Sequence, residues 1–222
     1  MLSRIVYILK ERGLVPKIES EIRTMLDFGK TMFEASSLAL LERRSVVFDL
    51  YAKDREINEL VVDIRKKLVE HLTISQATKV DAEVIFIKVI SDIERIGDYS
   101  KNLMDMARQY GKPLRESDYF RVLKDVFPKI LANFPRAEKA LFDCDEVPAR
   151  QVVDSHHKEI NAACQGIVTG LLGDESVAGP EAIALALTSR YFKRVSSHLK
   201  NVATTAINPF HQIGFVAEQS KD

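Results

Sequence analysis

The chain has 222 residues with 32 basic and 32 acidic side chains, so its formal charge is zero. This balance argues against a nucleic-acid-binding protein, which usually carries a net basic surface, and against a highly charged disordered chain. Hydrophobic residues make up 46% of the sequence, whereas glycine and proline number only 9 and 7, a composition that favours long helices around a sizeable core.

Six long helical segments are predicted in chain order, at residues 16–44, 45–73, 76–110, 118–143, 146–172 and 179–208. We expect Ser45 to cap the start of the second segment, and Gly111 with Pro113 to end the third. Pro128 and Pro135 are expected to kink or break the fourth, because each removes a backbone donor.

The regions outside these segments have separate expectations. Residues 1–15 are expected to form a lead-in helix, residues 111–117 a polar linker, and residues 210–222 an irregular tail. No apolar run approaches the ~18 residues that a transmembrane helix requires, and the start of the chain lacks the features of a signal peptide. We therefore expect the protein to act in the cytoplasm.

An internal repeat relates the two halves of the chain. The segment Glu94–Asn102 is echoed 99 residues later by Lys193–Asn201, and Glu56-Ile57-Asn58 is echoed by Glu159-Ile160-Asn161. Both matches occur in the same order. The sequence therefore predicts an all-α protein of two tandem antiparallel three-helix bundles, at residues 16–110 and 118–209.

A row of oxygen-bearing side chains follows one stripe of the third segment, at Glu94, Asp98, Asn102 and Asp105. The apolar residues of this segment fall on the opposite side of the helix, so we expect the row to face away from the core. Asp54 and Asn58 form a second pair one turn apart. Such oxygen ligands suit hard cations or iron-like metals, although an ordinary charged surface with Arg95 and Lys101 as partners is the alternative.

The segment Ser91–Asn102, with the sequence Ser-Asp-Ile-Glu-Arg-Ile-Gly-Asp-Tyr-Ser-Lys-Asn, resembles the motif of the PhoU family of phosphate-uptake regulators. The resemblance covers roughly residues 17–208. It implies a six-helix PhoU-like fold and a non-enzymatic negative regulator of phosphate uptake and phosphate-starvation signalling. The implied partners are the ATPase subunit of a phosphate ABC transporter and a sensor histidine kinase, so contact with the membrane would be indirect.

The resemblance also implies a metal ion or a multinuclear metal cluster, of iron, zinc or a similar metal, in the first repeat. Its ligands or supporting groups would be Asp54, Glu94, Asp98 and Asn102. A homodimer is expected as well.

The second repeat departs from this motif. Lys193 stands in the place of Glu94, Ser197 in the place of Asp98, and His157 in the place of Asp54. A lysine repels the cation that it would have to surround, so no metal cluster is expected in this repeat. Asp154 or His157 is expected to pair with Lys193 instead.

Two alternatives stay open. The five histidines, expected to be surface or capping residues, leave room for a histidine phosphotransfer or metal-handling bundle: His71, His156, His157, His198 and His211. The fourth segment has phenylalanines at helical spacing that form either a packing seam or a dimer interface: Phe120, Phe127, Phe134 and Phe142. No nucleophile arrangement or glycine-rich phosphate loop points to an enzyme.

Overall fold

The computed structural model describes residues 15–74 and 81–214, and all the regular structure within these residues is helical. The elements are α2 (Val15–Leu41), α3 (Leu50–Ile74), α4 (Asp81–Tyr110), α5 (Asp118–Asp143), α6 (Glu146–Asp154), the π-helix η1 (Ser155–Ile160), α7 (Asn161–Leu171), α8 (Gly179–Thr204) and the short 3-10 helix η2 (Phe210–Gln212). The predicted lead-in helix lies almost entirely in residues 1–14, outside the described residues.

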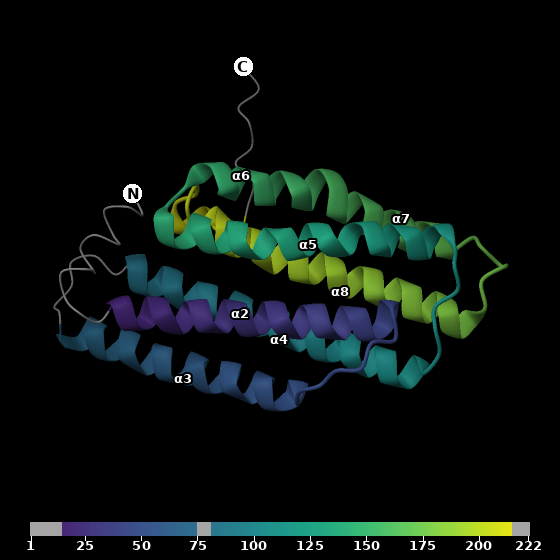
Figure 1. Cartoon of the computed structure of the whole chain (residues 1–222). Coiled ribbons are helices and arrows are strands. Elements are labelled where there is room, and N and C mark those ends of the chain that lie inside the picture. The colour runs from purple at the N-terminus through teal and green to yellow at the C-terminus, as the bar shows by residue number, and fades with distance from the viewer. Residues whose placement is uncertain (1–14, 75–80, 215–222) are drawn as a thin grey trace, which may run out of the picture.

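The helices lie side by side along one long axis (Figure 1). The inner helices are α2, α4, α5 and α8, with α4 packed on α8 and α2 packed on α5. Helix α3 covers α2 and α4 from one side, and α6, η1 and α7 cover α5 and α8 from the other. The expected all-α architecture of tandem three-helix bundles is therefore confirmed.

The two bundles share one apolar core. Phe33 of α2 is fully buried, and its ring centroid lies 5.9 Å from that of Phe127 and 6.1 Å from that of Phe134, both on α5. It also lies edge-on to Phe192 of α8 at 5.3 Å. The phenylalanine series of α5 thus forms an internal packing seam between the repeats.

Helix α3 begins later than the sequence indicated. Asp49 caps it, because its Oδ1 accepts hydrogen bonds from the backbone N–H groups of Tyr51 and Ala52 at 2.9 and 3.1 Å. The prediction of Ser45 as the N-cap is wrong: Ser45 lies in the irregular connection after α2. Serine and aspartate both suit an N-cap, so residue type alone did not separate the two positions.

Helix α5 is a single element from Asp118 to Asp143, with Pro128 and Pro135 inside it. A break at these prolines was therefore the wrong alternative. Both prolines are exposed, so water can bind the carbonyl groups that lose their helical N–H partner. The buried face of the helix, which holds Phe134 and its neighbours, continues through them.

The predicted fifth segment is one helical rod that changes its winding midway. A π-helical stretch at Ser155–Ile160 separates α6 from α7. Such wide turns are rare and are found preferentially at functional sites. No feature of residue spacing indicated this change.

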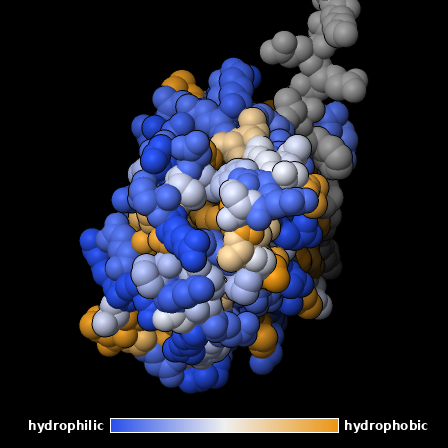
Figure 2. Space-filling view, turned by 90° about the vertical axis from the view of Figure 1, so that its right-hand side faces the viewer, coloured by the Kyte–Doolittle hydropathy of each residue, from blue (hydrophilic) through white to orange (hydrophobic). Residues whose placement is uncertain are grey.

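The surface at one end of the molecule is mainly hydrophilic, with small scattered apolar areas (Figure 2). Across the part of the chain that the structure describes, no helix has the length and the apolar character needed to cross a membrane.

Candidate functional site

The first repeat brings α3 against α4 at a glycine. A Cβ atom placed on Gly97 would lie 3.2 Å from Asp54 Oδ1 and 3.4 Å from the Ile57 side chain. Because glycine lacks that atom, α3 can approach closely enough for Asp54 to reach the outer face of α4. Asp54 is consequently only 6% exposed.

Lys101 lies between the carboxylates of Asp54 and Asp98. Its Nζ is 2.7 Å from Asp54 Oδ2 and 2.9 Å from Asp98 Oδ1. Burial on its own would lower the pKa of Lys101, but the hydrogen bonds that it donates to these two carboxylates outweigh burial and raise that pKa. Asn58 donates to Asp54 Oδ2 at 3.3 Å, and Arg95 binds Asp98 at 3.1 Å.

Three members of the predicted row, Asp98, Asn102 and Asp105, line one surface hollow, and the fourth, Glu94, lies outside it. Asp105 accepts a hydrogen bond from the Tyr51 hydroxyl of α3. Asn102, Asp98 and Lys101 line the same surface hollow as Asp105. Glu94 does not line this hollow, and its Oε2 lies 3.7 Å from Arg95 Nε. Glu94, Asp98 and Asp105 are half-buried and Asn102 is exposed, so the row does face away from the core, as expected.

The fit of this site to a metal ion is partial. Asp54 Oδ1 is buried and has no hydrogen-bond partner among the described residues, which leaves one carboxylate oxygen available to a cation. Lys101, however, uses the other oxygen of Asp54 and one oxygen of Asp98. In the described ranges, no three histidine, cysteine or acidic side chains are arranged to hold one ion. The metal site stays a prediction.

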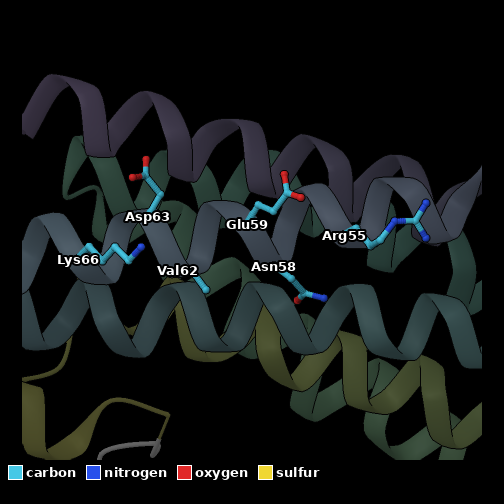
Figure 3. A pocket seen from close by; sticks show the side chains of 6 residues that line it. All are labelled: Arg55, Asn58, Glu59, Val62, Asp63 and Lys66. Atoms are coloured by element: carbon cyan, nitrogen blue, oxygen red, sulfur yellow. The ribbon is translucent and has the colours of Figure 1, made fainter.

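The outer face of α3 carries a second surface hollow (Figure 3). Charges of both signs surround one exposed valine in it, and all of its residues come from this helix: Arg55, Asn58, Glu59, Val62, Asp63 and Lys66. Asn58 connects this surface to the buried Asp54 through its hydrogen bond. The face therefore adjoins the site on α4.

The second repeat has a different charge pattern at the equivalent place. Asp154 pairs with Lys158 at 3.1 Å, one turn further along the same helical rod. Within the described residues, neither Asp154 nor His157 forms an ion pair or a hydrogen bond with Lys193, so the expected pairing of Lys193 is wrong. The helical winding places Lys158 within closer reach of Asp154.

The expectation of surface or capping histidines is wrong for two of the five. His156 is 5% exposed and its Nδ1 lies 3.0 Å from Ser196 Oγ. His198 is 8% exposed, with its Nδ1 at 2.7 Å from Asp92 Oδ1. The hydrogen bonds available inside the bundle compensate these rings for their loss of water.

Asp92 is a buried residue whose role the sequence reasoning missed. It lies where α4 meets α8 and accepts hydrogen bonds from His198, from Asn201 at 2.9 Å and from Lys88. A signal was present: Asp92 falls beside the apolar stripe of α4, where an acid is unusual unless it has partners. This cluster links the two repeats through polar groups.

The comparisons with known proteins agree with this architecture. Residues 22–107, which span most of α2 to α4, match the family model described as "PhoU domain". The chain is 22% identical, over 202 residues, to the Phosphate-specific transport system accessory protein PhoU homolog of Deinococcus radiodurans, covering 84% of this chain and 92% of the relative.

A solved structure has the same fold. The crystal structure of PhoU from Pseudomonas aeruginosa superimposes with a TM-score of 0.75 and 18% sequence identity, over 88% of this chain and 96% of that one. The resemblance to the PhoU family that the Ser91–Asn102 motif indicated is therefore confirmed.

Proposed function

Because the chain carries a PhoU domain at residues 22–107 and has the fold of a PhoU protein across both repeats, we propose that it is an accessory regulator of phosphate transport. The observation that carries this proposal is the family match, which includes the whole Glu94–Asn102 motif. The protein would act in the cytoplasm as a negative regulator of uptake and of phosphate-starvation signalling. It would do so by binding other proteins rather than by catalysis.

The outer face of α3 is the surface that we propose for partner recognition. Its charged residues lie along the helix in the order basic, acidic, acidic, basic: Arg55, Glu59, Asp63 and Lys66. Charges of this kind mainly set the rate and specificity of association. Val62 and Val69 are 51% and 55% exposed on the same helix and offer apolar contact area. The partners would be a transporter ATPase subunit and a sensor histidine kinase.

A capture experiment from phosphate-replete cells tests this proposal. The full chain should recover a phosphate-transporter or kinase subunit, and the double substitution Arg55→Glu/Lys66→Glu should reduce recovery at least tenfold by reversing the charge at the interface. Arg121→Glu/Arg150→Glu is the matched control, since both arginines are exposed in the other repeat.

Two outcomes would contradict the regulator proposal. One is the recovery of neither kind of subunit by the unchanged protein. The other is transfer of a phosphoryl group from a phosphorylated kinase to a histidine of this chain, which would instead support the phosphotransfer alternative.

We also propose that Asp54, Glu94, Asp98 and Asn102 provide oxygen ligands for a metal ion or cluster of iron, zinc or a similar metal. The unpartnered Asp54 Oδ1 supports this proposal. Lys101 would then compete with the metal, because both cations need oxygens of Asp54 and Asp98. A bound metal would supply a rigid positive charge that joins α3 to α4.

Elemental analysis of the purified protein tests whether a metal ion binds at Asp54 and Asp98 and whether Lys101 competes with it. Lys101→Met should raise the metal content or affinity, since it removes the competing charge, whereas Asp54→Ala/Asp98→Ala should abolish binding. Lys158→Met serves as the control, because that lysine pairs with Asp154 in the other repeat. Stoichiometric metal that persists in the double variant would place the site elsewhere.

The homodimer expected from the sequence remains a proposal with one added constraint. The phenylalanine seam of α5 packs against Phe33 and Phe192 within the chain. A dimer would therefore use another surface. Light scattering after size-exclusion chromatography would decide, and a mass of one chain at working concentration would contradict the dimer.

A further inference from the structure

A cluster of two lysines and two histidines lies in the second repeat, where η1 packs on α8. We call Lys193, Lys200, His156 and His157 the basic cluster. Lys193 and Lys200 are two turns apart on α8, so they share one face with the hydroxyl-bearing Ser196 and Ser197 between them. The ring of His156 reaches Ser196 Oγ at 3.0 Å and lies 4.9 Å from the ring of His157.

The internal repeat explains what is unusual about this cluster. Lys200 occupies the position of Lys101, 99 residues further on. Lys101 has two carboxylate partners, but Ser197 replaces one of the corresponding acids and His157 replaces the other. Lys200 is nevertheless the more buried of the two lysines, at 8% exposed, and its Nζ donates to the carbonyl of Gly214 at 2.6 Å.

The acids near the cluster are already engaged. Asp154 acts on His157 only through its charge, which raises the pKa of that ring, and it pairs with Lys158 at 3.1 Å. Asp92, the carboxylate that acts on Lys200, is surrounded by His198, Asn201 and Lys88. Within the described residues, neither Lys193 nor Lys200 forms an ion pair.

Burial is the largest influence on the pKa values of Lys200, His156 and His157. Burial lowers the pKa of Lys200. Burial, and then the charges of Lys200, His157 and Lys193, lower the pKa of His156 to about 4. The pKa of His157 is lowered as well, by burial and then by Lys200. Buried cations without a partner are costly, which means that an anion arriving there would relieve that cost.

We propose that the basic cluster binds a small tetrahedral oxyanion such as phosphate or sulfate. Each lysine ammonium has three N–H donors, and Lys200 donates one of them to the carbonyl of Gly214. Ser197 and His157 supply further polar groups without hydrogen-bond partners in the described ranges. Donors from two elements that pack on each other, η1 and α8, suit an anion with oxygens on all sides better than a flat carboxylate.

Access to the site follows from the exposure of its members. His157 is exposed, and Lys193 and Ser197 are half-buried, so they form the entrance. Lys200 and His156 are buried and form the base. The proposal does not depend on the regulatory function proposed above, because it concerns an equilibrium of the isolated chain.

Isothermal titration calorimetry on the full chain tests the site, with inorganic phosphate, sulfate and acetate as separate probes. We expect one phosphate per chain, with sulfate also bound and acetate bound much more weakly. Lys193→Gln should weaken the binding of phosphate at least about tenfold, since it removes one charge-assisted hydrogen bond. Lys158→Gln is the matched control: that lysine lies in η1, next to His157, but is paired with Asp154, and its removal should leave the affinity unchanged.

A second variant restores the arrangement of the first repeat. Ser197→Asp places a carboxylate where Asp98 stands relative to Lys101. It should raise the melting temperature without phosphate and abolish phosphate binding. NMR signals of the His156 ring provide an independent readout, because phosphate should raise the pKa of that ring in the unchanged protein.

Three results would overturn the proposal. The first is a phosphate Kd weaker than about 10 mM together with unshifted His156 signals. The second is an equal loss of affinity in Lys193→Gln and Lys158→Gln, which would indicate nonspecific attraction. The third is acetate binding as tightly as phosphate, which would overturn the assignment of a tetrahedral ligand.

Discussion

Asp92 lies buried between α4 and α8 and has a pKa that its neighbours control. Burial alone would raise this pKa, but hydrogen bonds from His198, Lys88 and Asn201 outweigh it and lower the pKa. The charged carboxylate is therefore the form that the folded state prefers. It binds His198, which is 106 positions away in the chain, and Asn201, which is 109 positions away. Asp92 thereby joins the two repeats.

Replacement of Asp92 by alanine should reduce the free energy of unfolding by about 3 kcal/mol, because it leaves the buried His198 and Asn201 without their acceptor. Urea denaturation at pH 7 measures this loss. Asp63→Ala is the control, since that aspartate is exposed and bound only to Lys67. A loss no greater than that of the control would contradict the assignment.

The same carboxylate predicts a dependence of stability on pH. A group whose pKa is lower in the folded state stabilises the fold at any pH above its unfolded pKa of about 4, and this contribution disappears as the pH falls through the folded pKa. The difference in unfolding free energy between the unchanged protein and Asp92→Ala should therefore shrink below about pH 4. A difference that is constant from pH 7 to pH 2 would contradict this prediction.

At the scale of helices, local sequence chemistry fixes where α3 begins. Asp49 accepts two backbone hydrogen bonds at the start of this helix, and the Ser45 side chain accepts none from the described residues. Both are exposed, so packing contributes little to either position. The two residues therefore form a matched pair for measuring the cap.

Asp49→Ala should lower the free energy of unfolding by about 1 kcal/mol, because two N–H groups of the first turn lose their acceptor. Ser45→Ala should leave stability within about 0.5 kcal/mol. Thermal or urea unfolding of both variants measures these losses. Equal losses of unfolding free energy in the two variants would restore Ser45 as a candidate cap.

The prolines inside α5 lower the stability of the fold, because each removes a helical hydrogen bond, and substitution can measure this loss. Pro135→Ala should raise the free energy of unfolding by about 1–2 kcal/mol, because alanine restores the hydrogen bond to the carbonyl of Leu131 while giving back some entropy to the unfolded chain. Pro180→Ala is the control. Pro180 lies in the first turn of α8, where an N–H has no helical partner, so its removal should give no gain.

At the scale of the whole molecule, the two repeats form one cooperative unit. Phe33 belongs to α2 but contacts rings of α5 and α8, and α4 packs along α8. Neither repeat can bury its inner face without the other. The charge difference between corresponding faces, acidic around Lys101 and basic around Lys200, thus occurs on a shared rigid body.

Phe33→Ala should reduce the free energy of unfolding by about 3–5 kcal/mol, since it opens a cavity at the contact of both repeats. Unfolding followed by far-UV and near-UV circular dichroism should remain a single transition. Phe142→Ala, at the half-buried end of the same seam, should cost less. Separate transitions for the two repeats would show that they fold independently.

The sequence by itself determined the helical class, the order of the six helices, the family resemblance and the outward-facing acidic row. Periodicity, caps and breakers act over a few residues, so they can be read locally, as the bounds Asp118–Asp143 of α5 illustrate. Where two signals of similar quality lay close together, as at Ser45 and Asp49, local chemistry did not choose between them.

The tertiary structure alone decided which charges meet. Lys101 reaches Asp54 across 47 positions, and His198 reaches Asp92 across 106. Only packing at Gly97 and between α4 and α8 brings such groups together, because helix periodicity sets the direction of a side chain but not the helix that it faces. For the same reason, the tertiary structure was needed to show that Lys200 is buried without an ion pair among the described residues.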